Sequence, residues 1–307
     1  MAIQDAMCAH LRGVHSHLLL DRQGQRLKTV NSLSGGKTSS YMAVHYPADY
    51  NLFALVRTDD KSCMFQDSKI RQIVSDKIGA EFIGTLEQDE IIYTMLDLEQ
   101  YIGKDIVWLS PSTFEGVIEK HSTDTKTYLP NVMQRFCTVD MKITPIKNWL
   151  YENTELPVVM RMGFRANETS RAIRMTSRQR EDGVEWDRFI VGKRGTRNKW
   201  GELPYRVVEF PLISDGIYKH QIENYWSDKS VRFAYMNNCV GCFHRNEMLL
   251  KLMSSKEPSK FDWFVNQENS GAQFKKETSY AKIKSHKLQI DLFDNDFDEC
   301  DSGYCGL

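Results

Sequence analysis

Residues 30–42 read VNSLSGGKTSSYM, an apolar run that meets two glycines and continues into small polar residues. We expect a strand at residues 27–33 and a helix at residues 39–45. Paired glycines let the backbone approach an anion, the start of a helix presents unpaired N–H groups to it, and Lys37 adds a mobile positive charge. Residues 34–39, called the glycine loop below, therefore favour phosphate binding. The alternative interpretation is a surface turn before a helix. The predicted phosphate-binding residues are Ser34, Gly35, Gly36, Lys37, Thr38 and Ser39.

Beyond the glycine loop, short apolar runs alternate with longer amphipathic stretches, as is typical of parallel strands joined by helices. The expected strands are residues 52–57, 81–84, 105–109 and 157–163, and the expected helices are residues 67–77, 88–101 and 139–151. This pattern predicts an α/β fold with a doubly wound, mostly parallel sheet. Ligands of such sheets bind at the carboxyl ends of the strands, which is where the glycine loop stands. Its spacing is neither that of the Walker loop nor that of the dinucleotide fingerprint.

We expect three parts along the chain. Residues 1–26 form an N-terminal extension, residues 27–226 the nucleotide-binding α/β domain, and residues 227–307 a smaller helical region with a cysteine pair and an acidic tail. The helices expected near the C-terminus are residues 215–226, 245–254, 260–267 and 278–286. Residues 174–199 are a basic insertion in which eight Lys or Arg face four Asp or Glu. This insertion is either a solvated segment or a loop that contacts phosphates.

The composition restricts the class of protein. The 307 residues are 41% hydrophobic, which excludes a disordered chain, and the formal net charge of -1 provides no overall basic field for a nucleic acid or a membrane. No apolar run approaches the length of a spanning helix, so we expect no membrane and a cytoplasmic location. Seven cysteines in a chain of this size are then expected to be reduced and available to metals.

The glycine loop resembles the Ser-Gly-Gly-Lys-Asp-Ser signature of the PP-loop ATP pyrophosphatase superfamily, with Thr38 in place of Asp. Four later stretches are similar, in the same order, to motifs of its phosphoadenosine phosphosulfate (PAPS) reductase-like family. They are Thr58-Asp59-Asp60, the Cys-Thr to Pro-Ile block at residues 137–146, Gly163-Phe164-Arg165-Ala166-Asn167-Glu168-Thr169-Ser170-Arg171, and Phe210-Pro211-Leu212-Ile213. The resemblance covers residues 27–226 and implies the adenine nucleotide alpha hydrolase-like fold.

The resemblance implies that the chain binds ATP with Mg²⁺ and cleaves it to AMP and pyrophosphate. The cleavage would activate an acceptor, or transfer a group to it, in sulfur metabolism or nucleic-acid modification. Four residues are expected to stabilise the developing charge: Lys37, Lys142, Arg165 and Arg171. Asp59 or Asp60 would help to hold Mg²⁺, and Gly163 would line the nucleotide site. Arg165 could instead form only a salt bridge to Glu168, and Asp59 and Asp60 could instead lie in a solvated loop without a bound ion.

Two other functions stay open. Sulfonucleotide reductases, which act on PAPS or adenosine phosphosulfate, attack with a cysteine near the C-terminus in a Glu-Cys-Gly-Leu-His signature. This chain ends Tyr304-Cys305-Gly306-Leu307, so Cys305 could serve that reaction. Because Thr38 replaces the usual Asp, a second alternative is a protein that senses nucleotides or binds nucleic acids without turnover. Lys37 favours ATP, because a cation is most useful where a pyrophosphate leaving group gathers charge.

Cys239 and Cys242 are separated by two residues, so both thiolates can reach one ion. Adenosine phosphosulfate reductases have an iron-sulfur cysteine where this chain has Cys137, and Cys300 or Cys305 would complete a four-iron cluster. The alternatives are a Zn²⁺ site made of Cys239, Cys242, Cys300 and Cys305, and purely structural thiols. The expected partners are an adenine nucleotide, a nucleic acid at the basic insertion, a protein that supplies sulfur, and a second copy of the chain.

Overall fold

The computed structural model describes residue 20 and residues 24–286. The chain folds into two compact units, each built from three separate segments. Unit 1 comprises Met1–Phe53, Leu96–Val107 and Ile146–Val231, and unit 2 comprises Ala54–Met95, Trp108–Pro145 and Arg232–Leu307. The glycine loop lies in unit 1. Residues 137–142 and the cysteine pair lie in unit 2, together with the segment that carries Asp59 and Asp60.

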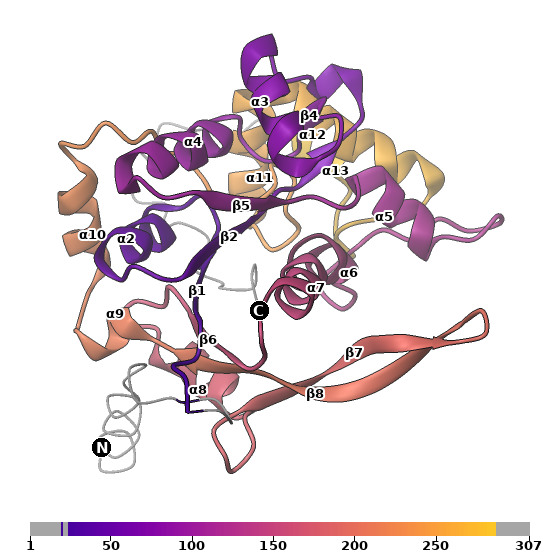
Figure 1. Ribbon diagram of the computed structural model, residues 1–307. Coiled ribbons are helices and arrows are strands. Elements are labelled where there is room, and N and C mark those ends of the chain that lie inside the picture. Colours follow the sequence, from indigo (N-terminus) through magenta and orange to yellow (C-terminus); the bar gives the residue numbers. More distant parts are fainter. Residues whose placement is uncertain (1–19, 21–23, 287–307) are drawn as a thin grey trace. The chain divides into compact units, whose positions relative to one another are not determined.

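A six-stranded, mostly parallel sheet forms the centre of unit 1, which confirms the expected α/β class (Figure 1). Its strands run in the order β5-β2-β1-β6-β8-β7. They are β1 (Thr29–Leu33), β2 (Tyr50–Ala54), β5 (Ile106–Leu109), β6 (Val158–Arg161), β7 (Glu185–Arg194) and β8 (Arg197–Glu209). β1 is parallel to β2 and to β6, β6 is parallel to β8, and β7 runs antiparallel to β8.

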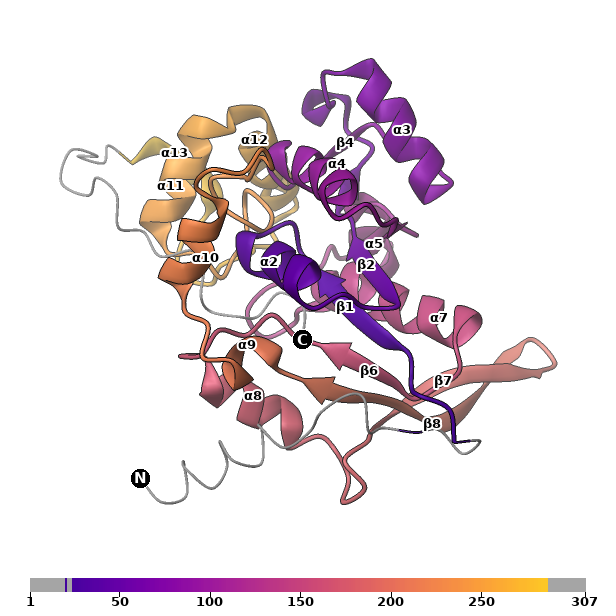
Figure 2. The ribbon, with the colours of Figure 1, turned by 60° about the vertical axis from the view of Figure 1, so that its left-hand side comes forward.

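The central strands of this sheet are buried on both sides, as their continuous apolar runs require. Val30, Leu52, Val158 and Val159 are 0% exposed. The helices of unit 1 are α2 (Lys37–His45), α7 (Thr144–Asn153), α8 (Thr169–Thr176), α9 (Pro211–Ser214), α10 (Lys219–Trp226) and the second half of α4 (Glu90–Ile102). In the turned view, α10 lies beside α2, the helix that follows the glycine loop (Figure 2).

Unit 2 is mainly helical and has a core of aromatic side chains. Trp263, Phe264, Phe274 and Tyr280 are each at most 1% exposed. Its strands are β3 (Arg57–Thr58) and β4 (Gly84–Thr85), and its helices are η2 (Lys61–Cys63), α3 (Ser68–Ile78), α5 (Phe114–His121), α6 (Phe136–Thr138), η3 (Val139–Ile143), α11 (Glu247–Lys256), α12 (Pro258–Gln267), η4 (Glu268–Ser270) and α13 (Tyr280–Ser285). The four helices expected near the C-terminus correspond to α10, α11, α12 and α13.

Three expectations about elements are wrong. The strand expected at residues 81–84 is not part of the parallel sheet, because Gly84 pairs with Thr58 in the antiparallel β3–β4 ribbon. The run at residues 52–57 is interrupted, since β2 ends at Ala54 and β3 begins at Arg57. The basic insertion is not simply a loop: half of it is strand β7 and the start of β8, in which apolar residues such as Phe189 and Ile190 support the extended backbone.

None of the helices in the described part of the chain has the length and apolar character that crossing a bilayer demands.

Candidate functional site

The glycine loop lies at the point where the strand order of unit 1 reverses. The chain leaves β1, forms β2 and then β5 on one side, and returns to form β6 on the other side of β1. The connections that leave β1 and β6 therefore diverge, and a crevice outside the carboxyl ends of these two strands is the usual ligand site of an open α/β sheet. β1 ends at Leu33, directly before the glycine loop.

The backbone of the glycine loop has the conformation that only glycine adopts without strain. Gly35 has φ +77°, in the left-handed region. Gly36, at the N-cap of α2, is extended, and no side chain caps this helix. The hydroxyl of Ser39 closes the loop instead: it accepts the Ser34 N–H at 3.2 Å and donates to the Gly36 carbonyl at 3.1 Å. The first turn of α2 thus presents its N–H groups to a ligand.

Lys37 is the first residue of α2, and its side chain lies at the start of this helix. Among the residues that the structure describes, no carboxylate pairs with its ammonium group. Its carbonyl oxygen accepts a hydrogen bond from the Trp226 indole N–H at 3.0 Å. The backbone of Lys37 is therefore fixed by α10, while the side chain stays available to an anion.

Gly163, which follows β6, lies against the start of α2, as expected of a residue at the same edge of the sheet. A Cβ atom at this position would stand 3.6 Å from the Cα of Ser39 and from the methyl group of Thr38. The structure thus brings Gly163 and the glycine loop together within unit 1.

Arg165 and Arg171 share one carboxylate. The Arg165 guanidinium binds Glu168 at 3.1 Å, with both side chains at most 9% exposed, and the Arg171 guanidinium binds the other oxygen of Glu168. The salt bridge from Arg165 to Glu168 is confirmed. Arg171 also stacks on the Phe164 ring, 4.1 Å from its centroid. Glu168 therefore fixes both guanidiniums and leaves the three side chains with one net positive charge.

Asp59, Asp60 and Lys142 belong to unit 2 and have partners there. The Arg57 guanidinium lies 3.3 Å from Asp59, and Asp60 caps η2 by accepting the Ser62 N–H at 2.8 Å. The Lys142 ammonium binds a carboxylate oxygen of Glu87 at 3.0 Å. Sequence reasoning missed Glu87 because no motif marks it.

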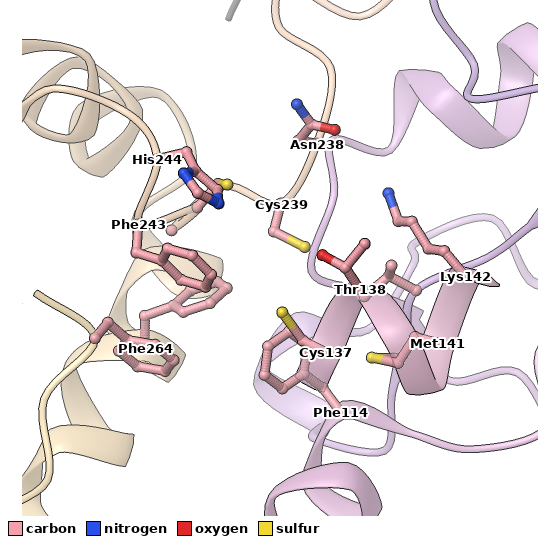
Figure 3. Close-up of a pocket in the computed structure, with 14 residues that line it drawn as sticks. Phe114, Cys137, Thr138, Met141, Lys142, Asn238, Cys239, Phe243, His244 and Phe264 are labelled. Atoms are coloured by element: carbon pink, nitrogen blue, oxygen red, sulfur yellow. The ribbon is translucent and has the colours of Figure 1, made fainter. Parts of the chain in front are cut away.

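The three described cysteines of the proposed metal set line one apolar pocket in unit 2. Cys137, Cys239 and Cys242 surround a cavity of about 30 Å³, with His244 and Lys142 at its edge. Figure 3 shows the sulfur atoms of Cys137 and Cys239 pointing into the space between their two segments. Further lining residues are the aromatic side chains Phe114, Phe243, Phe264 and Phe274.

The backbone around the cysteine pair is held closely. A Cβ atom at Gly241 would stand 2.4 Å from the Phe264 ring, so only glycine fits at this position. The Tyr280 hydroxyl donates to the Gly241 carbonyl at 3.0 Å. Arg245 is 1% exposed and donates to the Asn237 and Asn238 carbonyls, and among the described residues no carboxylate pairs with it.

The donor set of this pocket suits a thiolate-bound metal. Cys137, Cys239 and Cys242 are thiols, and burial together with the charges of Arg135 and Lys275 lowers the pKa of His244 to about 4, so that its imidazole is neutral near pH 7. Within residues 24–286, however, no three His, Cys, Asp or Glu side chains lie close enough together to hold a metal ion as they stand. Cys300 and Cys305 lie outside the described residues.

The models of known protein families, the curated proteins and the solved structures contain no match to this chain.

Proposed function

We propose that the protein is a PP-loop enzyme that binds ATP with Mg²⁺ at the glycine loop and cleaves it between the α and β phosphates. The observation that carries this proposal is the place of the glycine loop, directly after β1 at the reversal of strand order. The uncapped start of α2 lies there together with Lys37, whose ammonium group pairs with no carboxylate of the described residues. Anions bind at such helix starts because the N–H groups and the helix dipole both favour negative charge.

In the proposed reaction a nucleophile on the acceptor attacks the α phosphorus of ATP. A bond forms between the nucleophile and that phosphorus, and the bond to the bridging oxygen breaks, so that the electron pair leaves with pyrophosphate. Adenylated acceptor and pyrophosphate are the first products, and AMP is released when the acceptor reacts further. Lys37 and the N–H groups of the loop would stabilise the charge that gathers on the leaving pyrophosphate.

The other expected residues would have supporting roles. Arg165 and Arg171, fixed by Glu168, would place positive charge near the carboxyl end of β6. The roles of Lys142 in charge stabilisation and of Asp59 or Asp60 in holding Mg²⁺ stay predictions from the sequence, because these residues belong to unit 2.

The described residues that would hold a metal in unit 2 are Cys137, Cys239 and Cys242. The proposal leaves open a four-iron cluster or Zn²⁺: a cluster would supply electron transfer, whereas Zn²⁺ would pin the two segments of the pocket together. The aromatic walls would keep this site apolar. The positive charge of Arg245 would favour thiolates over thiols. Anaerobic purification, metal analysis and a visible spectrum would distinguish the two.

Product analysis tests the proposed reaction. The full chain is incubated with Mg²⁺ and ATP labelled at the α phosphate, with and without candidate acceptors, and AMP is separated from ADP. We expect labelled AMP or a labelled acceptor, together with an equal amount of pyrophosphate. ADP as the only product would contradict the proposal. In a parallel incubation with PAPS, release of sulfite would support a sulfonucleotide reductase. Tight ATP binding without either product would support a protein that senses nucleotides or binds nucleic acids without turnover.

A further inference from the structure

The hairpin of β7 and β8 extends beyond the rest of the sheet of unit 1. β6 pairs only with Arg206–Glu209 of β8, whereas β7 pairs with β8 from Arg206 out to Arg197. The outer part is therefore a two-stranded ribbon, visible in both views beyond the end of β6 (Figures 1 and 2). We call residues 189–201 the β-arm.

The β-arm has a firm root and an exposed outer end. Phe189 is 2% exposed and packs on Tyr151 and Tyr205, and the Lys147 ammonium of α7 binds Asp187 at 2.9 Å just before the arm. Every residue from 190 to 200 is exposed. The outer end is thus held out into solvent by a packed base.

The charges of the β-arm are all positive. Residues 189–201 contain no Asp or Glu and four cations: Lys193, Arg194, Arg197 and Lys199. No ion pair joins any of them to a described residue, although nearby Arg180 and Lys147 do pair with carboxylates. A chain with a formal net charge of -1 therefore concentrates on one ribbon four positive charges that pair with no carboxylate of the described residues. Such a ribbon attracts a polyanion.

The register distributes these cations over both faces of the ribbon. Arg194 pairs with Arg197, and Lys199 is two residues further along the same strand, so these three lie on one face. Lys193 pairs with Asn198 on the other face, which also carries Trp200 opposite Ile190. Trp200 is 51% exposed, and the Arg188 guanidinium lies 5.6 Å from its ring centroid.

We propose that the β-arm binds the phosphate backbone of double-stranded DNA. A two-stranded ribbon fits the major groove, whose two walls carry phosphates that cations on both faces can reach. A membrane surface is less suitable, because it would contact one face of the ribbon and leave the cations of the other face in water. Trp200 and Ile190 would contact bases inside the groove. That this nucleic acid is the acceptor activated with ATP rests on the proposed function.

Binding without nucleotide tests the β-arm separately from the ATP reaction. A fluorescent 20-base-pair duplex is titrated with the full chain while its anisotropy is measured between 50 and 200 mM salt. Four phosphate contacts predict that affinity falls by roughly 100-fold over this range, because the slope of log K against log salt is about -0.9 per contact. The variant K193Q/R194Q/R197Q/K199Q should lose this salt dependence and bind at least about tenfold more weakly at 100 mM salt.

A matched control removes four other exposed lysines that have no ion pair among the described residues: Lys28, Lys69, Lys276 and Lys282. K28Q/K69Q/K276Q/K282Q changes the net charge equally and should bind the duplex like the original chain. Unchanged thermal melting shows that both variants fold. Equal loss in both variants, no duplex binding at all, or equally tight binding to vesicles of anionic lipid would overturn the proposal. Duplex binding without AMP formation would leave the β-arm supported and contradict only the ATP reaction.

Discussion

The Trp226 indole N–H donates a hydrogen bond to the carbonyl oxygen of Lys37 at 3.0 Å, which ties α10 to the first residue of α2. Trp226 is 4% exposed. Trp226→Phe keeps most of the buried ring surface and removes this bond. We expect the free energy of unfolding to fall by about 1–2 kcal/mol and the affinity for ATP to fall several-fold, because the start of α2 is less firmly fixed. Urea denaturation and ATP titration measure the two effects.

A neighbouring hydroxyl provides the control for this prediction. Tyr225 lies next to Trp226 in α10, and its hydroxyl bonds that of Tyr101 at 2.9 Å near the surface. Tyr225→Phe should leave ATP affinity unchanged. If both variants bind ATP like the original chain, Trp226 has no part in positioning the loop.

The left-handed backbone of Gly35 gives a second prediction. Gly35→Ala should cost about 1–2 kcal/mol of stability, because a Cβ atom is strained at φ +77°, and should abolish detectable ATP binding. Gly216 has φ +66° and open space around it, so Gly216→Ala carries a similar backbone cost without touching the loop. Equal ATP affinity in the two variants would argue against the glycine loop as the phosphate site.

The pair of Lys142 and Glu87 tests whether Lys142 is structural. The Glu87 side chain is 2% exposed, and its second oxygen has no hydrogen-bond partner within the described part of the chain. Lys142→Met would leave a buried charge unpaired and should destabilise the protein by about 3–5 kcal/mol, whereas adding Glu87→Leu should restore much of this loss. Urea denaturation of both single variants and the double variant gives the free energies of unfolding for a double-mutant cycle. A Lys142→Met protein of normal stability that no longer forms AMP would instead make Lys142 catalytic.

Cys63 should be the least reactive of the described cysteines. Burial raises the pKa of its thiol to about 11, so little thiolate exists at pH 8. Because the folded-state pKa lies above the unfolded value, this thiol contributes stability below about pH 9 that is lost as the pH rises towards 11. Mass spectrometry after timed alkylation at pH 8 should find Cys63 modified last. Removing the thiol with Cys63→Ala should flatten the alkaline loss of stability.

The sequence predicts the parts of unit 1 whose signals are local. The apolar run before the glycine loop forms β1, and the small polar residues after it form α2, because strand period, glycine and helix start all agree there. The sequence does not predict the β7–β8 hairpin, because exposed strands with basic residues on both faces lack a regular apolar period. The two interleaved units could not be read from the order of residues, because contacts distant in sequence define them.

The candidate sites show the same limit. Cys239 and Cys242 line one pocket, as their two-residue separation predicts, and Cys137, which the family resemblance suggests, lines the same pocket. The sequence predicts Glu168 as a partner of Arg165, but its second bond to Arg171 depends on how α8 begins. Glu87, the partner of Lys142, is distant from it in the sequence, and no motif around Glu87 predicts that the two residues pair.

The binding of ATP by a Lys37→Met variant tests the central proposal most directly. Lys28 is exposed in the same unit and has no ion pair among the described residues, so Lys28→Met is the matched control. Calorimetric titration with ATP and Mg²⁺ should show at least about a tenfold loss of affinity for Lys37→Met, because a charge-assisted contact of roughly 1.5–3 kcal/mol disappears, and no loss for Lys28→Met. Equal affinity in the original chain and both variants would contradict phosphate binding at the glycine loop.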